Sequence, residues 1–324
     1  MKMKPKILIT PTSFLKPANA PARKKIESFA NEIIYNPLGK PLHPAQLLPL
    51  LEGVHGYIAG LDYITAEVID RAPATLKVIS RYGAGVDRVD IAACAKRGIK
   101  VTNTPGTNSV AVAELAFALM LNVARNIPFL NDSVQKNAWP ATASEGIELK
   151  GKTLGIIGFG AIGKNLATRA LAFGMTVHAH DPLFDAAFAT QHGIIKSPLD
   201  ALLRQSDFIS LHIPLTPQTK HLINAAAIAR MKPGAIIINT ARGGIIDETA
   251  AAAALKSGQL AGLGLDAFEQ EPLLDSPLKN LPRVILTPHT GAHTTESVAA
   301  MGMMAVDNCI DILNGKPNPY VINK

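Results

Sequence analysis

Cysteine is scarce in this chain of 324 residues, which contains only Cys94 and Cys309. The two lie far apart and fit no metal-binding spacing, so neither a disulfide framework nor a cysteine-based metal site organises the fold. No metal is expected. We expect buried, unreactive thiols, with a reactive thiol as the alternative. So few cysteines are typical of a reducing compartment, and the expected location is the cytoplasm.

The N-terminus lacks a long apolar run. Near the N-terminus the only apolar run is Ile7-Leu8-Ile9, which is too short for a signal-peptide core or a membrane span, so no membrane partner is expected. No low-complexity tract or fixed-period repeat occurs. The hydrophobic fraction of 48% and the charged fraction of 18% are typical of a globular protein, and 324 residues favour two domains.

The net charge of +7 is concentrated in the first hundred residues. Residues 1–100 hold 15 Lys and Arg against 8 Asp and Glu, whereas residues 101–324 hold 17 of each. No nucleic-acid recognition motif accompanies the basic segment, so no nucleic-acid partner is expected. The excess favours attraction of small anionic substrates, and a basic surface without a partner is the alternative.

Short β-like runs alternate with helix-like stretches in two series, which is typical of the α/β class. In the first series, strands are predicted at 6–10, 56–59 and 76–80, and a helix at 91–97. After Thr104-Pro105-Gly106 a helix is predicted to about residue 124, with Ser109 as its candidate N-cap. It is apolar on almost all sides, so we expect it to be buried at a domain or subunit interface.

The second series begins with a strand at 152–157. Further strands are predicted at 176–179, 207–211, 235–238, 262–265 and 284–286. Asp247 is the predicted N-cap of a helix that Gly258 closes, and a last helix covers about 294–313.

A glycine-rich turn follows the strand at 152–157. Gly158-Phe159-Gly160-Ala161-Ile162-Gly163 matches G-x-G-x-x-G, opens a helix-like stretch and precedes an acidic residue, Asp181, at the end of the next strand. This context is the one that a dinucleotide-binding turn requires. Asp181 would accept hydrogen bonds from the ribose hydroxyls and repel a 2′-phosphate, which favours NAD over NADP. A glycine turn that binds no nucleotide is the alternative.

A second glycine cluster, Ser80-Arg81-Tyr82-Gly83-Ala84-Gly85, follows the strand at 76–80. Its backbone N–H groups are candidates to bind a carboxylate. Arg81 would add positive charge, or would instead form a surface or interdomain ion pair.

Three polar residues each lie just past a predicted strand near the end of the chain, namely Arg242, Glu271 and His289. The carboxyl ends of parallel strands meet at one edge of a sheet, so we expect these side chains to lie together. The guanidinium fits a carboxylate bidentately, and the imidazole exchanges protons near neutral pH. A carboxylate beside the imidazole stabilises its charged form. A structural Arg–Glu pair and a histidine bonded to backbone are the alternatives.

These motifs, in this order, resemble the D-isomer-specific 2-hydroxyacid dehydrogenase family, most closely its short phosphoglycerate dehydrogenase-like members. The resemblance covers essentially the whole chain and includes His212-Ile213-Pro214-Leu215-Thr216, Ala241-Arg242-Gly243-Gly244, Glu271-Pro272 and Pro288-His289. It implies a Rossmann-type, doubly wound parallel sheet in an NAD-binding domain, residues 105–292. That domain would be inserted into a smaller, flavodoxin-like α/β substrate domain, residues 1–104 plus 293–324.

The resemblance also implies roles for individual residues. Arg242 would hold the substrate, His289 would be the acid and base, and Glu271 would orient and charge the imidazole. NAD contacts would come from the turn and from several later strand ends: Gly158, Gly160, Ala161, Ile162, Gly163, Asp181, Pro214, Thr240, Ala241, Asp266 and Gly291. Substrate contacts would come from Arg242 and the first glycine cluster: Arg81, Tyr82, Gly83, Ala84 and Gly85. Family members usually form homodimers through the inserted domain.

The implied reaction is NAD-dependent interconversion of a D-2-hydroxy acid and its 2-keto acid, most closely of the phosphoglycerate or hydroxypyruvate type. No regulatory domain is expected after Leu313, and Glu271 in place of glutamine argues against formate oxidation. Sulfonated or bulkier 2-keto acids also fit a carboxylate clamp, and the basic first segment favours a doubly charged substrate. A non-catalytic, NAD-sensing protein of the corepressor type is the alternative, and termini without disordered extensions weigh against it.

Overall fold

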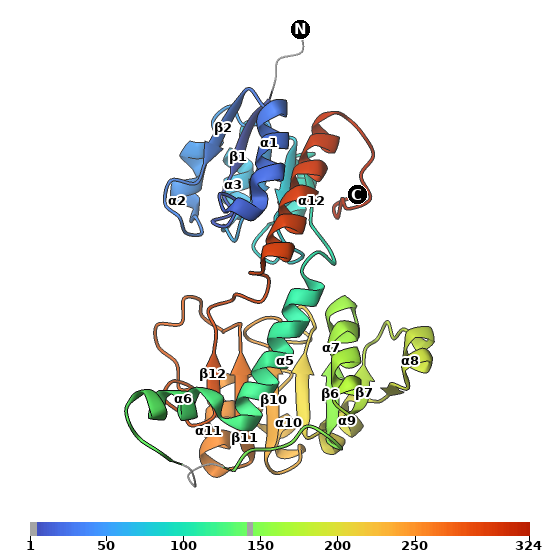
Figure 1. Ribbon diagram of the computed structural model, residues 1–324. Helices are drawn as coiled ribbons and strands as arrows, with labels where there is room; N and C mark the ends of the chain where they lie inside the picture. Colours follow the sequence, from blue (N-terminus) through green and yellow to red (C-terminus); the bar gives the residue numbers. More distant parts are fainter. Residues whose placement is uncertain (1–4, 141–144) are drawn as a thin grey trace. The chain divides into compact units, whose positions relative to one another are not determined.

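The computed structural model describes residues 5–140 and 145–324. The chain divides into two compact units, which we call the outer unit (residues up to 108 together with 292–324) and the inserted unit (residues 109–291) (Figure 1). The sequence placed these boundaries at 104/105 and 292/293. Each unit contains its own parallel sheet and its own core.

The outer unit contains a five-stranded parallel sheet in the order β2-β1-β3-β4-β5. Its strands are β1 (Lys6–Ile9), β2 (Glu32–Tyr35), β3 (Gly56–Ala59), β4 (Val78–Arg81) and β5 (Lys100–Thr102). Successive side chains of a strand point to opposite faces. Ile7 and Ile9 therefore pack in one core and Leu8 in the other.

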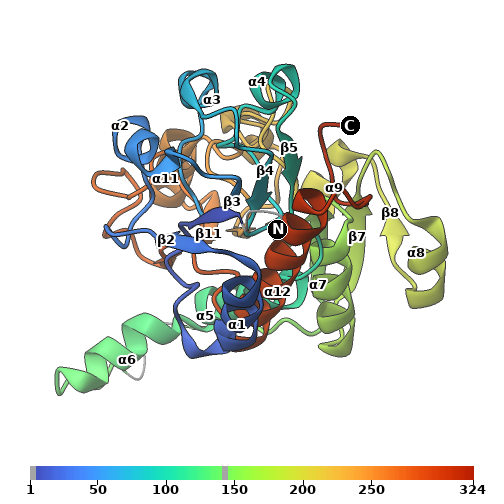
Figure 2. The ribbon, with the colours of Figure 1, turned by 90° about the horizontal axis from the view of Figure 1, so that it is seen from above.

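Helices cover both faces of the outer sheet. α1 (Ala20–Phe29) and the last helix, α12 (Thr295–Leu313), lie side by side on one face although they come from opposite ends of the chain (Figures 1 and 2). Ile26 of α1 and Val306 of α12 are buried in that core. α2 (Pro44–Leu47), α3 (Ala66–Arg71) and α4 (Ile91–Lys96) contribute to the core on the other face.

The inserted unit contains a seven-stranded parallel sheet in the order β12-β11-β10-β9-β6-β7-β8. Its strands are β6 (Thr153–Ile157), β7 (Thr176–His180), β8 (Ile195–Lys196), β9 (Phe208–Leu211), β10 (Ala235–Asn239), β11 (Leu260–Leu265) and β12 (Val284–Leu286). The strand order reverses between β6 and β9. In doubly wound sheets, ligands bind at the carboxyl ends of the strands at such a switch point.

Helices also cover both faces of this sheet, as a doubly wound fold requires. α5 (Ser109–Arg125) and α7 (Ala161–Ala172) pack on one face, while α9 (Leu199–Gln205), α10 (Ala225–Ala229) and α11 (Glu248–Ser257) pack on the other. α8 (Ala186–His192) packs near β8, and α6 (Ile127–Gln135) extends away from the sheet (Figure 2).

The predicted strands all form, and the structure adds β2, β5 and β8, which the apolar pattern did not reveal. Asp247 and Gly258 cap α11 as predicted. Ser109 is the first residue of α5 and not its N-cap, a correction to the expected helix start. α5 is mostly buried, as expected, but it is buried by β10, β11 and α7 of its own unit.

Both cysteines are buried, and burial raises the pKa of each thiol to about 12. No single helix among residues 5–140 and 145–324 is long and apolar enough to cross a membrane; α5 and α6 pass that test only jointly, as a pair bent by 64°.

Candidate functional site

The glycine-rich turn joins β6 to α7 at the carboxyl end of the sheet. Gly158 has a φ of +99°, and a Cβ atom there would overlap the carbonyl group of His212. A Cβ at Gly163 would overlap the carbonyl oxygen of Gly158, whereas Gly160 has open space on its bare side. The turn is thus tight at its first and third glycines and open at the second, where a pyrophosphate would approach the backbone.

The N-terminus of α7 suits an anion. Its N-cap is Gly160, which provides no capping side chain, so the first N–H groups of the helix point at the open side of the turn. Thr240 adds a buried hydroxyl that has no hydrogen-bond partner within the described residues. Both features fit a polar ligand at this edge.

Asp181 follows β7, and its carboxylate is fixed by backbone. Phe159 N donates to Oδ2 at 2.6 Å, and Leu183 N donates to Oδ1 at 2.7 Å. Each carboxylate oxygen accepts more than one hydrogen bond, so acceptor capacity remains for ribose hydroxyls. The residues of this edge therefore fit NAD.

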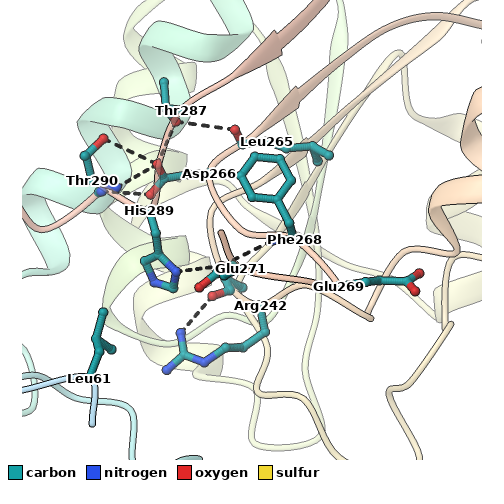
Figure 3. A network of polar contacts seen from close by, with 12 residues as sticks. Leu61, Arg242, Leu265, Asp266, Phe268, Glu269, Glu271, Thr287, His289 and Thr290 are labelled. Carbon is teal, nitrogen blue, oxygen red and sulfur yellow. Dashed lines mark hydrogen bonds and ion pairs between the residues drawn. The ribbon is translucent and has the colours of Figure 1, made fainter. Parts of the chain in front are cut away.

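Asp266, another predicted NAD contact, is buried and holds the loop that carries His289. Its Oδ1 accepts from Thr287 Oγ1 at 2.6 Å and from Thr290 N at 2.8 Å, and its Oδ2 accepts from Gly291 N at 2.7 Å (Figure 3). The structure thus gives Asp266 and Gly291 a shared structural role. The contacts of Asp266 and Gly291 with NAD stay predictions. The contact of Pro214, which is exposed, with NAD also stays a prediction.

The three strand-end residues lie together in the inserted unit (Figure 3). Nδ1 of His289 lies 2.8 Å from Oε1 of Glu271, with side-chain exposures of 31% and 20%. A carboxylate only accepts, so Nδ1 carries the proton of this bond, and Nε2 is the ring nitrogen left for a substrate. Phe268 N also donates to Glu271 Oε1, at 3.3 Å.

The backbone around the three residues is fixed by close contacts. His289 has a φ of +53°, a left-handed conformation that costs energy in a non-glycine residue and occurs at functional sites. Asn239, the buried last residue of β10, donates from Nδ2 to Arg242 O at 2.7 Å and accepts from Ala241 N at 3.0 Å. Arg242 in turn donates to Ala241 O at 2.8 Å. The only sign of Asn239 in the sequence is that a polar residue closes an apolar strand, and no role was predicted for it.

The predicted substrate residues of the outer unit are largely turned inward. Arg81 is buried and donates from Nη1 to the carbonyl oxygens of Ala59 and Tyr82. The hydroxyl of Tyr82 is also buried and donates to Val298 O at 2.9 Å. Gly83 N donates to Thr104 Oγ1 at 2.9 Å, which leaves the amides of Ala84 and Gly85 as the candidates for carboxylate binding.

His212, in the loop after β9, was not singled out for a role. Its Nε2 pairs with Ser210 Oγ at 2.9 Å, and its buried Nδ1 has no partner within the described residues. Burial lowers the pKa of this imidazole to about 3, so the ring is neutral at physiological pH.

Comparison with known proteins agrees with this arrangement. Residues 117–291 match the model of the D-isomer specific 2-hydroxyacid dehydrogenase, NAD binding domain. The D-3-phosphoglycerate dehydrogenase of Methanocaldococcus jannaschii is 45% identical over 261 residues, which are 80% of this chain and 50% of the relative. The hydroxypyruvate reductase of Thermotoga maritima is 47% identical over 247 residues, which are 75% of this chain and 79% of the relative.

A solved structure extends the likeness to the full chain. The crystal structure of a Thermus thermophilus protein, 38% identical, covers 98% of this chain and 99% of its own with a TM-score of 0.87. The chain spans about half the length of the phosphoglycerate dehydrogenases that it matches. The inserted unit is an NAD-binding domain, and the chain belongs to the D-isomer specific 2-hydroxyacid dehydrogenase family.

Proposed function

We propose that this protein is an NAD-dependent oxidoreductase that interconverts a D-2-hydroxy acid and its 2-keto acid. The observation that carries the proposal is the 2.8 Å pair between His289 Nδ1 and Glu271 Oε1. It lies beside Arg242, in the same unit as the glycine-rich turn (Figure 3). An oriented imidazole, a cationic clamp and a dinucleotide site are the groups that hydride transfer to a keto acid requires.

Each side chain has one task in this reaction. NADH, when bound, supplies the hydride. His289 donates the proton on Nε2 to the keto oxygen, and Glu271 keeps the ring oriented and stabilises its charged form. Arg242 binds the substrate carboxylate with its planar fork and stabilises the negative charge that develops on the keto oxygen.

The substrate class that we favour is a small anionic 2-keto acid of the hydroxypyruvate or phosphohydroxypyruvate type. Two relatives are named for such reactions, D-3-phosphoglycerate dehydrogenase and hydroxypyruvate reductase. Within the outer unit, the amides of Ala84 and Gly85 are candidates to bind an anion, and the basic first hundred residues also favour an anionic substrate.

Mixing the protein with NADH and a panel of 2-keto acids tests both parts of this proposal. The panel holds hydroxypyruvate, phosphohydroxypyruvate, glyoxylate, pyruvate and a sulfonated 2-keto acid, and the readout is the loss of NADH absorbance. We expect rapid oxidation with the first two. Tight NADH binding without oxidation of any panel member would contradict an enzymatic function and support an NAD-sensing role.

We further propose that the protein forms a homodimer through α6. No residue of α6 is buried in the single chain, and Ile127, Phe129 and Val134 are each about half exposed. A groove at the base of the helix is lined by Phe129, Leu281 and Ile285, among others. The exposed apolar side chains of α6 and the neighbouring groove form the surface that we expect a second copy of the chain to cover across a two-fold axis. Light scattering should give twice the chain mass, and a monomeric mass for wild type would contradict the proposal.

A reducing compartment, such as the cytoplasm, is the location that we propose. Cys94 and Cys309 are buried and form no disulfide. Such unpaired thiols persist where the surroundings are reducing. Both should react with an alkylating reagent when protein taken from cells is unfolded without reductant; a disulfide between them would contradict the proposal.

A further inference from the structure

Two loops of the inserted unit carry two of the three candidate catalytic side chains, Arg242 and Glu271, and His289 lies on a third loop after β12. The first, which we call the arginine loop, is Thr240–Gly244 after β10, and the second, the glutamate loop, is Asp266–Ser276 after β11. A Cβ atom at Gly243 would overlap the carbonyl oxygen of Phe268, so the two backbones are in direct contact. The distance from Arg242 to Glu271 therefore depends on how these loops are held together.

His221 contacts both loops. Its backbone N–H donates to Gly244 O, in the arginine loop, at 2.7 Å. Its Nε2 lies 3.2 Å from Oε1 of Glu269, in the glutamate loop. Its φ of +49° is a left-handed conformation, which a non-glycine residue keeps only where its surroundings hold it. No sequence motif points to His221.

Glu269 is held a second time by the start of α11. Oε1 of Glu269 accepts from Glu248 N at 3.3 Å, and Oε1 of the buried Glu248 accepts from Glu269 N at 2.8 Å. Oε2 of Glu248 accepts from Ser276 Oγ, at the far end of the glutamate loop, at 3.0 Å. Carboxylates are favoured beside a helix N-terminus, which supports this reciprocal arrangement.

We propose that Glu269 is a positioning residue. With His221 and Glu248 it fixes the glutamate loop against the arginine loop and so sets the position of Glu271, two residues along the chain, relative to His289 and Arg242. This inference rests on the proposed function for its effect on turnover. Its effect on the His289 ring does not depend on that function. Exposed ion pairs such as Glu269–His221 contribute little to the free energy of unfolding. We therefore expect the loss of Glu269 to change the geometry of the site more than the stability of the protein.

Three variants test the proposal. Glu269→Ala removes both contacts, Glu269→Gln keeps an oxygen acceptor at the same place, and Glu148→Ala removes an exposed carboxylate elsewhere in the unit. We expect Glu269→Ala to lower kcat about tenfold while the Kd for NADH is unchanged, since small displacements of reacting groups are costly. Glu269→Gln should restore kcat to within about twofold of wild type, and Glu148→Ala should be normal. A normal kcat in folded Glu269→Ala, or no rescue by glutamine, would overturn the proposal.

A second readout separates this proposal from the enzymatic one. NMR of protein with labelled histidine should show the ring signals of both His221 and His289 shifted in Glu269→Ala. In Glu269→Gln and Glu148→Ala the His289 signals should stay at their wild-type positions. Unmoved His289 signals in Glu269→Ala would overturn the positioning role. If wild type oxidises no NADH with any keto acid, only the proposed function fails, and the NMR result still decides the positioning role.

Discussion

Polar residues lie at the carboxyl ends of parallel strands in both units, but Asp62 of the outer unit and the Glu271–His289 pair of the inserted unit use their polar groups differently. In the outer unit, the carboxylate of Asp62 is buried at the ends of β1 and β3. It accepts from Tyr57 OH at 2.8 Å, Leu42 N at 2.7 Å, Gly60 N at 3.2 Å and the Thr10 hydroxyl. Burial, followed by the charge of Asp62, raises the pKa of Tyr57 well above its usual range.

In the inserted unit, the pair of Glu271 and His289 keeps a ring nitrogen available for a substrate. Its side chains are partly exposed, and only one nitrogen of the ring is used by the pair. A polar residue at a strand end is therefore a candidate to bind a substrate only through those groups that form no hydrogen bond within the fold. The carboxylate of Asp62 and the hydroxyl of Tyr82 are bonded within the fold, whereas the pair with Glu271 uses only one ring nitrogen of His289.

Replacement of His289 should have the largest effect on turnover. His289→Gln keeps a polar side chain but cannot transfer a proton, so we expect kcat to fall at least ~100-fold, the usual contribution of general acid–base catalysis. NADH titration should show unchanged binding. His192→Gln, on α8, is the matched control and should be normal. Near-normal turnover of His289→Gln would show that His289 is not the proton donor, and its contrast with the structural Asp62 would then no longer hold.

Replacement of Asp62 should act on stability. Asp62→Asn puts an amide where the buried donors of Thr10, Tyr57 and Leu42 need an acceptor, and we expect a loss of about 3 kcal/mol of unfolding free energy. Urea denaturation measures this loss. The exposed Asp70→Asn should change stability little. A stable Asp62→Asn protein would show that this carboxylate is not structural.

His212 predicts a pH dependence within the inserted unit. Its pKa is about 3 when folded, against 6.5 for an unperturbed imidazole, because burial disfavours the charged form. Below pH 6.5 the unfolded chain binds a proton that the folded chain does not, so stability falls as the pH falls. This residue alone should lose about 2 kcal/mol between pH 7 and pH 5.

The check is denaturation of wild type and His212→Gln at both pH values. Ionisable groups common to the two proteins cancel in the comparison, and the variant should be the less sensitive to acid. Equal losses in the two proteins would show that the imidazole is solvated when folded.

The sequence predicted the strands that carry function because each combines a compact apolar run with a distinctive polar residue after it. Arg242, Glu271 and His289 were brought together by this rule alone, since parallel strands end at one edge. β8 was missed because it has two residues, Ile195 and Lys196, and both are exposed at the edge of the sheet. Such a strand has no periodicity to detect.

The sequence did not predict the directions in which these side chains point. Arg81 and Tyr82 belong to a glycine-rich segment that reads as an anion site, yet tertiary partners far along the chain, Ala59 and Val298, hold their polar groups inside. The same limit hid His221, whose partner Glu269 lies 48 residues away. Contacts of this range follow from the packed fold and leave no local pattern.

The turnover of keto-acid reduction, compared between wild type and Glu271→Gln, tests the central claim most directly. Glu271 accepts from Nδ1 of His289 at 2.8 Å, and a neutral amide in its place supports the ring less well when the proton is transferred. A kcat at least about tenfold below that of wild type, with NADH binding unchanged, is the result we predict. A wild-type kcat in folded Glu271→Gln would contradict the pairing of these two residues as the proton-transfer unit.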